Sequence, residues 1–226
     1  MPIPRGFVPY RSTGSSLGGS TRRYHTRAKN AKQIFIGDLV VAVSGATGLG
    51  VTPYAAGTDG TAAAGAVLGV VEGIFDANRK PYVFSQPTNG PLIPTATNAY
   101  VDVNIDPNQT YLVAVNGTAS AAMMGRYMTV DTTVMGTATG MSPMMVGVAT
   151  TVNPIRTPVT ADQTPFNGAW PLYCLEVTPW EDSVVDNPVG TASYKGTAGS
   201  NKNFVEVKIT QAALNGVHGP AMRIVA

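Results

Sequence analysis

The chain has 226 residues, enough to bury a core as one β domain or as a domain with an appendage. Only 12% of them are charged, against about 25% in an ordinary soluble domain, so small uncharged residues must cover much of a surface suited to contact with other proteins. The 25 Gly and 17 Pro are spread along the sequence and favour short strands joined by turns over long helices. Cys174 is the single cysteine, which excludes an intrachain disulfide and a multi-cysteine metal site and predicts a small buried apolar side chain.

The hydropathy pattern gives no sign of a membrane segment. No apolar run approaches the roughly 18 residues that a helix needs to span a bilayer. The first residues, MPIPRGFVPYRST, lack the continuous apolar core of a signal peptide. We therefore expect a soluble protein, made in a cytosol, with no membrane partner.

The net charge of +2 conceals a strong asymmetry. Residues 1–32 hold seven Lys or Arg and no acidic residue, which leaves eight basic and thirteen acidic residues for 33–226. Early prolines, a Ser/Gly-rich stretch and the absence of apolar periodicity predict an extended arm over 1–32 that becomes ordered on a partner. A solvated, disordered tail is the alternative.

The arm supplies the candidate partner contacts. Its cations would be attracted to an acidic surface of protein or nucleic acid, and its interleaved aromatic residues could fill pockets or stack on bases. The candidate contact residues are Arg5, Phe7, Tyr10, Arg11, Arg22, Arg23, Tyr24, Arg27, Lys29 and Lys32.

The folded part begins with the strand region 33–43, in which Gly37 and Asp38 predict a bend between two short strands. The glycine cluster that follows, SGATGLG, superficially resembles a phosphate-binding turn. We predict a loop instead, because the glycine spacing is reversed and the sequence after Gly50 has no helical periodicity. Residues 66–75 predict a further strand or strand pair.

Residues 100–115 carry the clearest local pattern in the chain. Val101, Val103 and Ile105 alternate with polar residues, and 111–115 form a second apolar run. Between them, Asp106-Pro107-Asn108-Gln109 has the composition of a type I turn. We interpret the whole stretch as a β-hairpin.

The rest of the chain continues the strand pattern. Strands are expected near 125–130, 144–148, 172–178 and 204–209, with a long loop at 152–168 and a single helical turn at 211–214. The methionines between 123 and 145 are interpreted as adaptable core or interface residues. The fold class is therefore all-β, a sandwich or barrel of roughly eight to ten short antiparallel strands over 33–226, preceded by the arm.

No constellation of catalytic residues is visible. The two histidines, His25 and His218, lie in the arm and in a Gly-Pro tail, so a serine nucleophile has no credible base. Asp102 with Asp106, and the acids at 181, 182 and 186, could bind a hard cation, but a solvated strand edge and loop are favoured. We predict no enzyme activity, no cofactor and no metal.

Three segments carry a resemblance to a known family: QIFIGDLV at 33–40, VLGVVEGIF at 67–75, and 100–115 with its acidic-Pro-Asn turn. Together they resemble the head decoration, or cement, proteins of tailed bacteriophages. The resemblance covers about residues 33–115, and the later third is similar only in its strand content and a late Trp-acidic loop.

This resemblance implies a non-enzymatic virion protein that binds the outer surface of an assembled head and bridges major capsid subunits, commonly as a homotrimer. No direct contact with nucleic acid is expected, and deletion of 1–32 should abolish or sharply weaken binding to undecorated heads. The alternatives are a tail-tube or head-tail joining protein, then a major capsid protein, for which no long helix is visible, and last a small β-fold enzyme or nucleic-acid binder.

Overall fold

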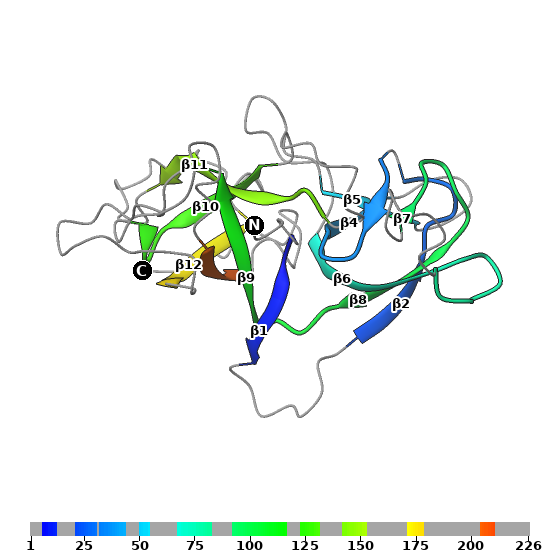
Figure 1. The fold of residues 1–226 in the computed structure, drawn as a ribbon, viewed down its shortest axis with the longest axis horizontal. Helices are drawn as coiled ribbons and strands as arrows, with labels where there is room; N and C mark the ends of the chain where they lie inside the picture. Colours follow the sequence, from blue (N-terminus) through cyan, green and yellow to red (C-terminus); the bar gives the residue numbers. More distant parts are fainter. Residues whose placement is uncertain are drawn as a thin grey trace, which may run out of the picture.

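The computed structural model describes residues 6–12, 21–30, 32–43, 50–54, 67–82, 92–116, 123–131, 142–152, 171–178 and 204–210. Their regular elements are thirteen β-strands, so the predicted all-β class is confirmed. Among these residues, no helix is long and apolar enough to cross a membrane. The strands form two main sheets and one small ribbon, shown in Figure 1.

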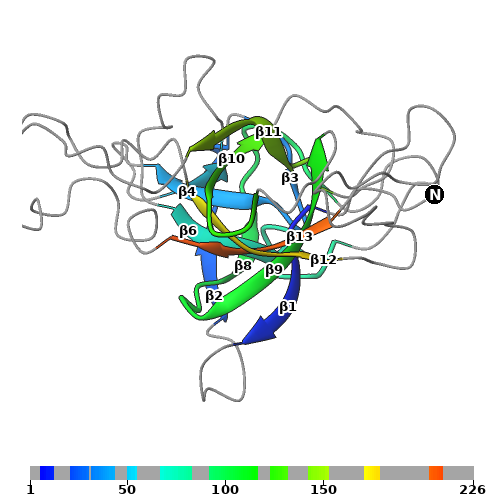
Figure 2. The same cartoon turned by 90° about the vertical axis from the view of Figure 1, so that its left-hand side faces the viewer.

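The first sheet closes on itself into a barrel. Its order is β1 (Val8–Ser12), β9 (Gln109–Asn116), β11 (Met145–Val152), β10 (Tyr127–Asp131), β12 (Leu172–Thr178) and β13 (Phe204–Ile209). Because β13 also pairs with β9, the strands β9, β11, β10, β12 and β13 enclose a five-stranded barrel. Figure 2 views the molecule from the barrel side, with β1 outside β9.

Side chains fill the barrel. Alternate residues of its strands point inward because successive side chains of a strand face opposite sides. These buried residues are Tyr111, Val113, Val115, Met128, Val130, Val146, Leu172, Cys174, Val205, Val207 and Ile209. Cys174 is buried, as predicted, and the interior is a packed core.

The second sheet packs against the barrel through one face. Its order is β2 (Thr21–His25), β8 (Tyr100–Asn104), β6 (Val67–Phe75), β4 (Leu39–Val43) and β5 (Gly50–Pro53). Leu39, Val41, Val67 and Val70 join the barrel core. The opposite face buries Val40, Val71, Ile74, Val101 and Val103 with Ile34 and Ile93, which belong to the ribbon of β3 (Ile34–Phe35) and β7 (Leu92–Ile93).

The interpretation of 100–115 as a hairpin is wrong, although its two strands and turn are present. β8 pairs with β2 and β6, whereas β9 pairs with β1, β11 and β13. The Asp106 carboxylate accepts a hydrogen bond from the Asn108 N–H (2.8 Å), and the Asn104 side-chain oxygen accepts one from the Asp106 N–H (3.0 Å). The turn therefore connects β8 in the second sheet to β9 in the barrel.

The expectation of an arm without a partner in its own chain is corrected for the described parts of 1–32. β1 pairs with β9 and β2 pairs with β8, so the described parts of this segment add one strand to each of the two sheets (Figure 1). The physical reason is that β8 has an open edge beside β6, and that β11 covers only the end of β9, which leaves residues 109–112 open to β1. Pro9 is tolerated because β1 is itself an edge strand.

Other local predictions are confirmed. Gly37, with φ +88°, and Asp38 form the bend between β3 and β4. β4 and β5 pair antiparallel across residues 44–49, so a strand follows the glycine cluster where a phosphate-binding turn would need a helix. Met123, Met128, Met144 and Met145 are buried. The predicted helical turn at 211–214, and the predicted loop at 152–168 apart from Val152, lie outside the described residues.

Candidate interaction surface

Of the ten predicted contact residues, one is buried, one is partly buried and one lies outside the described residues. Phe7 is 1% exposed, its ring meets that of Tyr111 edge-on at 6.2 Å, and its N–H donates to the Gly37 carbonyl (2.9 Å). The prediction of Phe7 as a partner contact is therefore wrong, because it is a core residue. Tyr24 is partly buried against the core of the second sheet. Arg5 lies outside the described residues.

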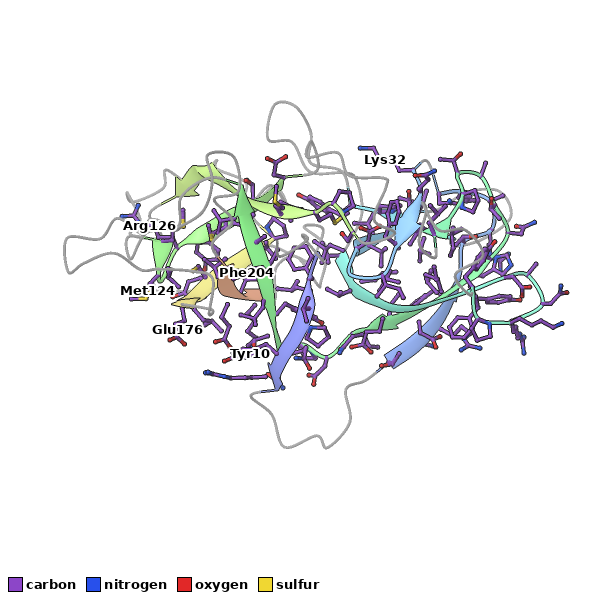
Figure 3. The ribbon with its side chains drawn as sticks, in the orientation of Figure 1. Tyr10, Lys32, Met124, Arg126, Glu176 and Phe204 are labelled. Atoms are coloured by element: carbon purple, nitrogen blue, oxygen red, sulfur yellow. The ribbon has the colours of Figure 1, made fainter. Side chains whose placement is uncertain are left out.

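Tyr10 and Arg11 lie on the outside of the barrel. The Arg11 guanidinium stacks 4.5 Å from the Tyr10 ring centroid and donates to its hydroxyl (2.9 Å). It also lies 3.6 Å from the buried Glu206 carboxylate and 4.0 Å from that of Glu176, which Figure 3 labels near Tyr10. Arg11 thus compensates a buried charge of its own chain, while the Tyr10 ring stays 39% exposed.

Arg23 is held on the same face of the second sheet as Leu39 and Val70, further along β8 from the barrel core. Its guanidinium donates two hydrogen bonds to the Asp102 carboxylate (2.7 and 2.8 Å) and lies 4.0 Å from the Phe75 ring centroid. The pKa of Arg23 is raised, mainly by the hydrogen bond to Asp102. A Cβ on Gly73 would lie 3.1 Å from the Phe75 ring, so the missing side chain lets that ring lie flat on the sheet. Asp102 is therefore engaged by Arg23, which leaves it a poor cation ligand.

The next row of the same face contains His25, Tyr100 and Phe75, which are opposite one another across β2, β8 and β6. The His25 ring meets the Tyr100 ring edge-on at 4.6 Å, and Arg79 lies 5.4 Å from the Tyr100 centroid. His25 Nδ1 accepts the Arg27 N–H (2.7 Å). The pKa of His25 is lowered, first by burial and then by the Arg27 charge, so the ring is neutral near pH 7.

Three turns frame this end of the sheet. The turn 26–29 is closed by the Lys29 N–H donating to the Thr26 carbonyl (3.1 Å). The Thr26 hydroxyl accepts the Ala99 N–H (3.0 Å), and the Asn30 amide donates to the Pro94 carbonyl (2.6 Å), which ties this turn to 94–99. The turn 76–80 is built on the Asp76 carboxylate, which accepts the N–H groups of residues 78 and 80 (both 2.8 Å).

We call this region the basic end of the second sheet and define it by Arg23, His25, Arg27, Phe75, Arg79, Lys80 and Tyr100. In Figure 1 it lies at the end of the molecule away from the barrel. Arg79 and Lys80 are exposed and make no ion pair with any described residue. Arg22 and Lys32 are exposed elsewhere on the surface, and Lys29 is half-buried beside Gly50.

Sequence reasoning missed Arg79, Lys80, Phe75 and Tyr100 as members of a surface, since only strand pairing brings them to β2. The polar run 76–80 is the available signal in the sequence, and its composition indicates no more than a turn. Within the described residues, no group of three His, Cys, Asp or Glu could hold a metal ion. His218 and the acids at 181, 182 and 186 lie outside those residues. Comparison of the chain with family models, curated proteins and solved structures found no match.

Proposed function

We propose that this chain is a structural virion protein that binds the outer surface of an assembled bacteriophage head and stabilises the capsid by bridging major capsid subunits. The resemblance over residues 33–115 suggests this role. The observation that carries it is a β body with few charges whose exposed arginines are held in place at one end by aromatic rings and turns. Such a surface suits recognition of another protein.

Bridging would work through several weak contacts made at once. In a homotrimer each copy presents the same surface, so three moderate contacts to neighbouring subunits add up to strong attachment. Within the described residues β2 pairs with β8 alone, and an edge strand of this kind can accept an added strand from a partner. The protein would act on the capsid surface of virions assembled in the host cytoplasm.

Deletion of residues 1–32 is no longer a clean test of this function. That deletion removes β1, β2 and the buried Phe7, so it would disturb the fold as well as any contact. The full chain should be mixed with heads that lack decoration, and bound protein should be measured by sedimentation. Binding in a fixed ratio to capsid subunits is expected, and no binding would contradict the proposal.

The same preparation tests the alternative, a tail-tube or head-tail joining protein. Such a protein would form rings or tubes by itself, which negative-stain images of the purified chain would reveal. Discrete trimers that attach to heads are expected instead.

A further inference from the structure

We propose that the basic end of the second sheet recognises an acidic protein segment, and that Arg79 is the central residue of this recognition. The geometry around Arg79 favours an acidic ligand. The identification of the segment with the head surface rests on the proposed function.

Backbone conformation singles out this end. Four described residues other than glycine have positive φ: Arg27 (53°), Ala28 (54°), Arg79 (64°) and Ala96 (51°). Glycine or asparagine would suit such positions best, because a Cβ is crowded there. All four lie in the three turns that frame the basic end, and two of them are arginines. An arginine at a position that favours glycine indicates that its side chain serves a purpose.

The side-chain geometry leaves Arg79 available for a ligand. Its guanidinium lies over the Tyr100 ring, and the His25 ring packs edge-on against the same Tyr100 ring. Arg23 is already neutralised by Asp102, and His25 is uncharged near pH 7, so neither contributes much net charge. Arg79, with Lys80 beside it, therefore provides the fork of N–H donors that binds a carboxylate in two places.

The surroundings favour a protein ligand over a nucleic acid. The Asp102 carboxylate lies against Arg23, and the Asp76 carboxylate lies in the turn that carries Arg79 and Lys80, where they would repel a continuous phosphate backbone. The Phe75 and Tyr100 rings already have guanidinium groups over them, so they offer no open platform for base stacking. A polypeptide can present a single carboxylate to Arg79 without a continuous line of negative charge beside Asp76 and Asp102.

The test uses the full chain and a fluorescein-labelled twelve-residue peptide of alternating Glu and Ser, with binding measured by fluorescence anisotropy at low salt. Arg79→Gly removes the guanidinium and suits the backbone, so the fold should be unaffected or more thermally stable. We expect this variant to bind the peptide about five- to tenfold more weakly, as the loss of one charge-assisted contact implies.

Two matched variants separate the charge from other effects. Ala96→Gly replaces another residue of positive φ by glycine without changing the charge. Arg126→Ala removes a cation at the barrel end of the molecule (Figure 3). Both should bind the peptide as the parent does. The proposal is overturned if the parent does not bind the peptide, if Arg79→Gly binds it equally well, or if an oligothymidylate of equal charge binds more tightly with the same dependence on Arg79.

The head-binding assay keeps the two proposals apart. Peptide binding that depends on Arg79, without any attachment to heads, would refute the virion function and leave the acidic-ligand site in place. Attachment to heads that Arg79→Gly leaves unchanged would refute the assignment of the acidic segment to the head surface and leave the virion function.

Discussion

Asp38 makes the stability of this protein depend on pH in a predictable direction. It lies fully buried in the bend between β3 and β4, where one carboxylate oxygen accepts the Phe35 N–H (2.8 Å). Its other oxygen, Oδ1, has no hydrogen-bond partner among the described residues. Burial raises the pKa of Asp38 to about 7, and Ser142 and the Phe35 N–H oppose this shift only in part.

The sign follows from comparing the folded and unfolded states. The carboxyl has its ordinary pKa of 3.8 when unfolded and about 7 when folded, so the folded state holds the proton more tightly. Its contribution to the free energy of unfolding is complete below about pH 4 and falls by about 1.4 kcal/mol per pH unit up to about pH 7. The total loss over this window is about 4 kcal/mol.

Asp38→Asn isolates this contribution. The amide oxygen can still accept the Phe35 N–H, but the side chain no longer ionises. Urea unfolding of both proteins, followed by far-ultraviolet circular dichroism from pH 4 to 8, gives the difference between their free energies of unfolding. We expect that difference to shift in favour of the variant by about 4 kcal/mol between pH 4 and 7.5. A difference that does not change with pH would refute the argument from burial.

The remaining predictions concern packing and the thiol. Phe7→Ala should lower the free energy of unfolding by about 3 to 5 kcal/mol, because it leaves a cavity in the core. Tyr10→Ala removes an exposed ring and should change that free energy by less than about 1 kcal/mol. Equal effects of the two substitutions in urea unfolding would contradict the position of β1. Gly69→Ala should be severely destabilising, as seen in a lower melting temperature, since a Cβ there would meet the Asn104 carbonyl oxygen at φ +152°. Burial raises the pKa of Cys174 to about 12, so its thiol should react with a disulfide reagent at pH 8 only after unfolding, and rapid reaction of the native protein would show the barrel interior to be open.

The strands and turns were predictable because they depend on neighbours in the sequence. Alternation located β8 and β13, and the Gly37-Asp38 pair located the bend that buries Asp38. The turn at Asp106 was also recognisable, because its carboxylate binds an N–H two residues ahead. Each of these features is fixed within a few residues.

Strand partners were not predictable in this way, and the hairpin shows why. Whether β8 and β9 pair with each other depends on which other edges compete for them, and β2, β6, β1 and β13 are distant in sequence. The N-terminal segment was misjudged for the same reason. Its prolines and linker composition describe the isolated chain correctly, but edge pairing with β8 and β9, together with burial of Phe7, orders it within the domain.

This difference changes how the protein is expected to bind. An arm that folds on its partner would lose conformational entropy during binding, which lowers affinity for a given contact area. Here Arg23 and Arg27 lie on or directly after β2, and the side chains and turns around them are already fixed by Asp102, Thr26 and Asn30. The conformational entropy of these residues is already lost when the domain folds, so the basic end can recognise a ligand as a preformed surface. The basic end therefore combines cations from residues 1–32 with Arg79 and Lys80 from the middle of the chain.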